Sequence, residues 1–124
     1  METIKLEYGE GRTRVCLEAS AVGKDWQVVL TAGKAHIGAV ALAVPCPRTA
    51  EGVTASVSVL TAPGHRDDIP AGKLALKLCK ATSTKVTVTA GLHLDGATLE
   101  EINDLVDNSV RIADILVLKL KGER

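Results

Sequence analysis

The spacing of apolar residues changes near Asp67, and this change constrains the fold more than any other feature of the chain. Before Asp67, apolar and polar residues alternate along several short segments, as they do in half-buried β-strands. After it, two segments repeat apolar residues every three or four positions, which is typical of amphipathic helices. Strands followed by helix, strand and helix predict an α+β fold, with two helices packed on one face of a largely antiparallel sheet.

Local signals predict where these elements begin and end. We expect strands over residues 3–8, 12–21, 26–31, 36–44, 54–60 and 85–90, with 36–44 buried on both faces or nearly so. Asp67-Asp68-Ile69-Pro70 predicts the start of the first helix, because acidic residues suit the positive end of the helix dipole and proline suits the first turn. A capping box formed by Thr98 and Glu101 opens the second helix, whose apolar stripe runs from Ile102 to Leu120.

The composition excludes several classes of protein. A chain of 124 residues is expected to form a single domain over residues 1–124. It holds 15 basic and 15 acidic residues, so it lacks the positive field of a nucleic-acid-binding protein. No apolar run approaches the roughly 20 residues of a membrane helix, and the first residues lack a signal-peptide pattern. We therefore expect a cytoplasmic protein with neither nucleic acid nor membrane as a partner.

All three histidines lie beside glycines, near the ends of predicted strands. His36 lies within residues 33–40, His65 within 62–68 and His93 within 90–96. Because glycine allows tight turns and close approach of the backbone, this pattern favours one composite site. Imidazole is the commonest metal ligand in proteins, and three histidines with an open position are typical of a reactive metal site. The alternative is a core His36 bonded to backbone, a capping His65 and a loop His93.

Two neighbouring features extend this site. If residues 92–95 continue a strand, His93 and Asp95 point the same way, so that Asp95 coordinates the metal or orients the imidazole. Residues 64–68 precede a predicted helix start, where backbone N–H groups and Arg66 suit a phosphate. The acidic pair at 67–68 argues against a bare anion site, unless it caps the helix or touches the metal. Arg66 is otherwise an ordinary solvated charge.

The three histidine segments also resemble a known family. Gly-Lys-Ala-His-Ile-Gly-Ala-Val (33–40), Pro-Gly-His-Arg (63–66) and Thr-Ala-Gly-Leu-His-Leu-Asp (89–95) occur in the order and at the spacing of the prenylated-flavin chaperone family. Its members are the small D subunits that accompany reversible hydroxyarylic acid decarboxylases of the gallate and hydroxybenzoate types. The resemblance covers roughly residues 26–118.

The resemblance implies a function in cofactor handling rather than catalysis. A member of this family is expected to bind a metal and reduced prenylated FMN, and to store, mature or deliver the cofactor to a large UbiD-like decarboxylase. We expect a divalent metal, zinc, manganese or iron, because imidazole suits several first-row metals. The family's histidine positions correspond to His36, His65 and His93, with Asp95 beside them. The flavin ring would lie against aliphatic side chains and glycine backbone, which makes Gly38 and Gly64 candidate contacts. Arg66, backbone N–H groups near 64–68, or Lys34 would meet the phosphate.

Two other functions remain open at this point. One is a small metal-dependent enzyme that acts on a compact anionic substrate, with a histidine or Asp95 as base. The other is a purely structural oligomeric domain. In each case we expect a homo-oligomer, because the stripe of the second helix, widened by Ile112 and Ile115, and the apolar segment 39–44 exceed what so small a domain can bury. A dimer or trimer would allow neighbouring chains to complete one site.

Overall fold

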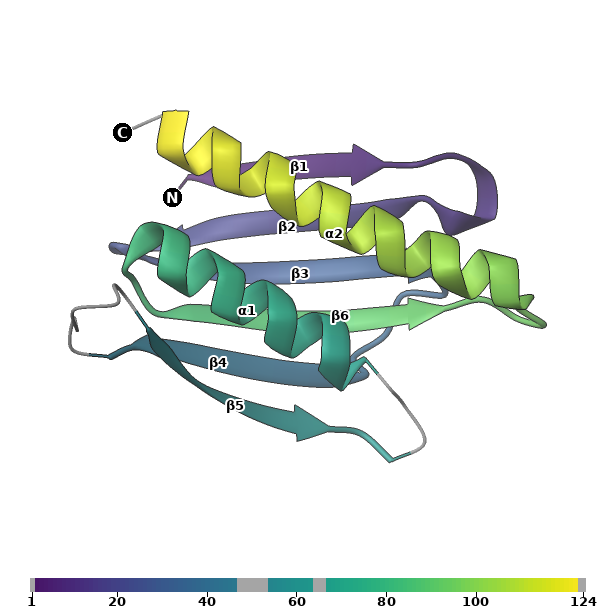
Figure 1. The fold of residues 1–124 in the computed structure, drawn as a ribbon, viewed down its shortest axis with the longest axis horizontal. Helices are drawn as coiled ribbons and strands as arrows, with labels where there is room; N and C mark the ends of the chain where they lie inside the picture. Colours follow the sequence, from purple (N-terminus) through teal and green to yellow (C-terminus); the bar gives the residue numbers. More distant parts are fainter. Residues whose placement is uncertain (1, 47–53, 64–66, 123–124) are drawn as a thin grey trace.

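Six strands form one sheet, and two helices lie across one of its faces (Figure 1). The computed structural model describes residues 2–46, 54–63 and 67–122. Its strands are β1 (Thr3–Tyr8), β2 (Val15–Val22), β3 (Asp25–Gly33), β4 (Ala39–Pro45), β5 (Ala55–Thr61) and β6 (Val86–His93). The helices are α1 (Asp68–Thr82) and α2 (Leu99–Gly122), with a short 3-10 turn, η1 (Gly11–Thr13), after β1. The α+β fold expected from the sequence is confirmed.

The strand order is β1-β2-β3-β6-β4-β5, so the last strand of the chain lies between β3 and β4. Neighbouring strands are antiparallel except β3 and β6, which are parallel. Gly33, at the end of β3, is paired with His93 at the end of β6. β4 begins at the same edge of the sheet, because Ala39 is paired with Ala90. Two strand ends and one strand start therefore meet at a single edge.

Each helix covers its own half of the sheet. α1 packs on β4, β5 and β6, and α2 packs on β1 and β2 (Figure 1). Small side chains allow α1 to approach β4 closely, and Ala41, Ala43, Ala71 and Ala75 are all fully buried. Larger aliphatic side chains fill the α2 half of the core, among them Leu17, Leu105, Ile112, Leu116 and Leu120. Apart from Trp26, the core is thus aliphatic, as expected of a chain without phenylalanine.

The segment expected as a strand over 36–44 differs from the structure in two ways. The strand begins at Ala39, and His36 lies in the loop before it. Burial also alternates along β4, and Leu42 is 42% exposed. The reason is that both helices pack on the same face, so the opposite face of this central strand faces outward. The prediction that this segment is buried on nearly both faces is wrong.

The start of α2 agrees with its sequence signal. The Thr98 N–H donates to Glu101 Oε1 at 3.0 Å, and the Glu101 N–H donates to Thr98 Oγ1 at 3.1 Å. This reciprocal pair is the capping box predicted from the sequence.

No helix within the described ranges is long and apolar enough to span a bilayer.

Candidate functional site

A polar cluster lies at the edge of the sheet where β3 and β6 end. The loop after β3 contributes Lys34 and His36, and the end of β6 and its following turn contribute His93 and Asp95. Asp67, immediately before α1, completes the cluster. The rings of His36 and His93 meet edge to face, with centroids 6.3 Å apart. Segments distant in the sequence therefore bring two of the three histidines together.

The hydrogen bonds of His36 restrict what its ring can do. Nδ1 lies 2.9 Å from the Lys34 carbonyl oxygen, and a carbonyl only accepts, so Nδ1 carries a proton. Nε2 lies 3.2 Å from Asp67 Oδ2. In the neutral ring this nitrogen presents a lone pair, which does not attract a carboxylate oxygen. The contact is favourable when a proton or a metal ion lies between the two atoms.

The Asp95 side chain is hydrogen-bonded to His93, although its backbone is not part of the strand. β6 ends at His93, and Asp95 lies in a turn, so the expected continuation of the strand through residue 95 is wrong. His93 Nε2 is 3.0 Å from Asp95 Oδ1, and Lys34 Nζ is 2.9 Å from Asp95 Oδ2. Hydrogen bonds from Lys34 and then His93 lower the pKa of Asp95 below its ordinary value. With Nε2–H donating to Asp95, the His93 ring presents Nδ1 as its acceptor.

Glycine is required at three positions because the cluster is so tightly packed. At Gly33 the φ angle is 63°, and a Cβ would overlap the backbone oxygen of His93. A Cβ at Gly38 would overlap the carboxylate oxygen Oδ2 of Asp67, and a Cβ at Gly91 would overlap the backbone oxygen of His36. Any side chain at either position would push the Asp67 or His36 segment away from the sheet. These three glycines therefore have a packing reason, whatever the ligand.

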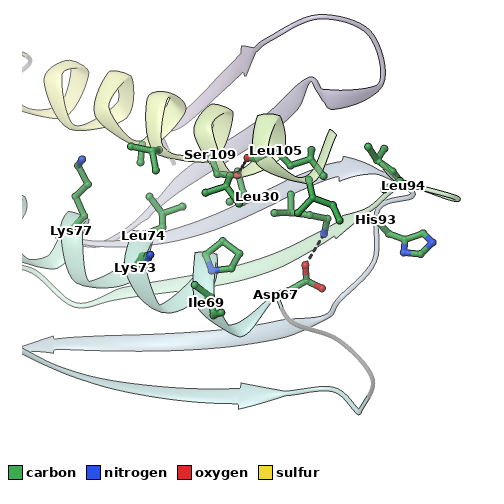
Figure 2. A pocket seen from close by; sticks show the side chains of 17 residues that line it. Leu30, Asp67, Ile69, Lys73, Leu74, Lys77, His93, Leu94, Leu105 and Ser109 are labelled. Carbon is green, nitrogen blue, oxygen red and sulfur yellow. Dashed lines mark hydrogen bonds between the residues drawn. The ribbon is translucent and has the colours of Figure 1, made fainter. Parts of the chain in front are cut away.

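Asp67 belongs to the cluster, although the sequence pattern predicts it as part of the start of the first helix. It precedes the helix as expected, but its side chain makes no capping hydrogen bond. It is 6% exposed, and its Oδ1 accepts the Leu92 N–H at 3.0 Å (Figure 2). A signal for this second role of Asp67 is the pair of carboxylates at 67–68, because one acidic residue is enough for a helix start. The pair is typical of a helix start, and its pattern alone does not distinguish that role from contact with a metal.

Other residues expected at the site lie outside the described part of the chain. Gly64, His65 and Arg66 fall within 64–66, so their positions relative to the cluster are not described. Across residues 2–46, 54–63 and 67–122, no group of three or more His, Cys, Asp or Glu side chains is arranged to hold a metal ion. The described portion of the cluster thus supplies two imidazoles, each with a carboxylate partner.

An apolar groove opens beside this cluster, between α1 and α2. It has a volume of about 540 Å³, and Leu30 of β3 and Leu92 of β6 contribute to its lining. The walls are mostly aliphatic, with Ile69 and Leu74 from α1 and residues such as Ile102, Leu105, Val106, Val110 and Ala113 from α2. Asp67 and His93 lie at one end, and the His93 ring is directed away from the apolar row (Figure 2). Ligand pockets commonly combine such an apolar lining with a few placed polar groups.

The chain is similar to one known protein family and, in its fold, to a solved structure. Residues 9–121 match the family described as the prenylated flavin chaperone LpdD-like domain. No curated protein sequence matches the chain. Among solved structures, the fold is similar to a chain of a novel chaperone complex for yeast 20S proteasome assembly, with a TM-score of 0.63 and 17% identity. That similarity covers 98% of this chain and 96% of the other, and at this identity it concerns the fold alone.

Proposed function

Because the chain belongs to the prenylated flavin chaperone family of LpdD-like domains, we propose that it binds reduced prenylated FMN and stores, matures or delivers it to a UbiD-like hydroxyarylic acid decarboxylase. The observation that carries this proposal is the groove between α1 and α2, which adjoins the polar cluster. Its volume of about 540 Å³ lies within the range of small-molecule sites. The chain itself acts as an accessory protein that holds the cofactor.

The groove suits the uncharged part of the ligand. The described part of its lining contains no phenylalanine, tyrosine or tryptophan, so the flavin ring would lie between aliphatic walls. Val106 and Val110 are half exposed on α2, and Ile69 is similarly exposed on α1. Covering these side chains with a flat ring system removes apolar surface from water, which favours binding. Lys34, Gly38, Gly64 and Arg66 stay proposed as flavin-binding residues.

A divalent metal beside the flavin is the second part of the proposal. His36, His65, His93 and Asp95 are the proposed ligands or ligand-orienting residues. The donor chemistry supports a cation here, because the His36 Nε2 and Asp67 Oδ2 atoms, 3.2 Å apart, attract each other only through a shared proton or metal ion. A bound zinc, manganese or iron ion would supply a Lewis acid to an oxygen-bearing ligand.

Self-association is the third part. Leu42 and Leu60 are 42% and 78% exposed, and they lie on the face of the sheet opposite the helices. Val29 shares this face, since the register joins β3, β6 and β4 there. Exposed apolar patches of this kind often mark interfaces. We propose a homo-oligomer in which this face is covered.

Anaerobic titration with reduced prenylated FMN tests the flavin proposal. The wild-type chain should bind the flavin, and Ala97→Trp, which fills the groove near His93, should weaken binding at least tenfold. Asn103→Trp is the matched control, because residue 103 is exposed on α2 and does not line the groove. Absence of wild-type binding, or equal binding by the Ala97 variant, would overturn the proposal.

Two further measurements test the bound metal and the delivery of the flavin separately. Flavin binding that is indifferent to a chelator would remove the metal from the proposal while leaving the groove. Transfer is tested by mixing the flavin-loaded chain with a cofactor-free decarboxylase. Decarboxylation should recover without free flavin, and recovery no faster than with free flavin alone would remove the delivery step.

A further inference from the structure

Among the described residues that line the groove, the lysines lie on one wall. Lys73 and Lys77 both line it, and they lie one turn apart on α1. Lys77 pairs with Asp114 of α2, an ion pair that joins the two helices. Lys73 is exposed, and within the described ranges it has no ion-pair partner. Lys73 is therefore the cation of the groove that is not already neutralised by another described residue.

The opposite end of the groove is acidic in its described part. Asp67 is buried there, with Asp68 next to it at the start of α1. The neighbouring cation Lys34 is paired with Asp95 and does not line the groove. Among the described residues, the ionisable nitrogens at this end already have carboxylate partners, His36 with Asp67, and His93 and Lys34 with Asp95, so none of them is left over for a phosphate. Lys73 follows Asp67 by six residues, about 9 Å along the helix, roughly one Debye length at physiological salt.

We propose that Lys73 binds the phosphate of the flavin nucleotide, while the uncharged ring system occupies the aliphatic part of the groove. This inference rests on the proposed function, and it assigns the phosphate to α1 instead of the loop at 64–66 or Lys34. Lysine suits this task as a point charge on a flexible stem that can follow a mobile phosphate.

The test compares two ligands that differ only in the phosphate. Reduced prenylated FMN and its phosphatase product, reduced prenylated riboflavin, are titrated anaerobically into the wild-type chain and three variants. Lys73→Met removes the proposed contact. Lys80→Met is the matched control, since it removes the same charge from an exposed position of α1 outside the groove. Arg66→Met tests the alternative that Arg66, and not Lys73, binds the phosphate.

The wild-type chain should bind the phosphorylated ligand more tightly. Lys73→Met should reduce that preference about tenfold to hundredfold, with unchanged affinity for the riboflavin form, and Lys80→Met should keep the preference. Equal wild-type affinity for the two ligands overturns the inference, as does loss of the preference in Arg66→Met but not in Lys73→Met. In both cases the flavin function stands. Absence of wild-type binding to either ligand instead removes the proposed function itself.

Discussion

The side chain of Asp67 connects the start of α1, the loop at His36 and the end of β6. Its two oxygens contact groups from different segments, the Leu92 N–H and the His36 ring. A buried carboxylate is stable only when its oxygens are hydrogen-bonded or paired with a cation. The position of Asp67 therefore depends on its neighbours being correctly placed, and the neighbours depend on it.

Replacing Asp67 separates its two roles. Asp67→Asn keeps an oxygen that can accept the Leu92 N–H, but removes the charge that faces His36. Asp67→Leu leaves the N–H without its acceptor, so it should lower the free energy of unfolding by a further 1–3 kcal/mol, in order of magnitude. Chemical denaturation measures this difference. Elemental analysis should show reduced metal content in both variants. Equal stability of the two variants would contradict the structural role of the hydrogen bond.

Two glycine-to-alanine substitutions should have opposite effects. Gly38→Ala places a methyl group against the Asp67 carboxylate, so we expect a loss of stability of a few kcal/mol and weaker flavin binding. Gly72→Ala lies inside α1, where the nearest atom to the added Cβ is a methyl carbon of Val59 at 3.5 Å, an ordinary contact. Alanine there should raise the free energy of unfolding by roughly 0.5–1 kcal/mol. Thermal denaturation of both variants checks the signs, and a stabilised Gly38→Ala would refute the packing argument.

At the scale of elements, the helices and strands were predictable because their signals are local. The period of apolar residues marks each element, and the capping box at Thr98 marks where α2 begins. The insertion of β6 between β3 and β4 was not predictable, since no local pattern records which strands pair. The same limit applies to the site. The glycines beside His36 and His93 pointed to it, whereas Asp67 already had an ordinary local explanation.

The capping box of α2 gives a prediction about helix stability. Thr98→Ala removes the side-chain oxygen that accepts the Glu101 N–H, and should lower the free energy of unfolding by about 1 kcal/mol. Thr98→Ser keeps the oxygen and should change stability by only a few tenths of a kcal/mol. Denaturant titrations distinguish the two variants. Similar losses in both would mean that the cap does not stabilise the helix.

Glu101 adds a dependence on pH at the same helix end. Hydrogen bonding from Arg12, and then from the Thr98 backbone, lowers the pKa of Glu101. Because the pKa is lower in the folded chain than in the unfolded one, this contribution is complete above the ordinary glutamate pKa and is lost as the pH falls through the lowered value. Stability measured from pH 6 down to about pH 3 should therefore decline less steeply for Glu101→Gln than for the wild type. An identical decline would contradict the pairing.

At the scale of the whole molecule, the helices leave one face of the sheet uncovered. This face is apolar on the β4–β5 side, and we expect it to be an interface between copies of the chain. Replacing Leu42 and Leu60 together by lysine should reduce the mass in solution to that of a single 13.0 kDa chain. Leu118→Lys is the control, because Leu118 is 71% exposed on α2. Light scattering at micromolar concentration makes the measurement, and a wild-type protein of 13.0 kDa would refute the expectation.

The central position of β6 has a consequence for how the chain acquires its structure during synthesis. The β1–β2–β3 meander and the β4–β5 hairpin are complete before β6 emerges from the ribosome, but each then exposes a strand edge that later becomes central. Unpaired edges of this kind are prone to association with other chains. We therefore expect residues 86–93 to join the two halves in a late, rate-limiting step, since the pairing of β3 with β6 closes a long stretch of chain. The nascent chain would then be most vulnerable to aggregation just before its last strand arrives.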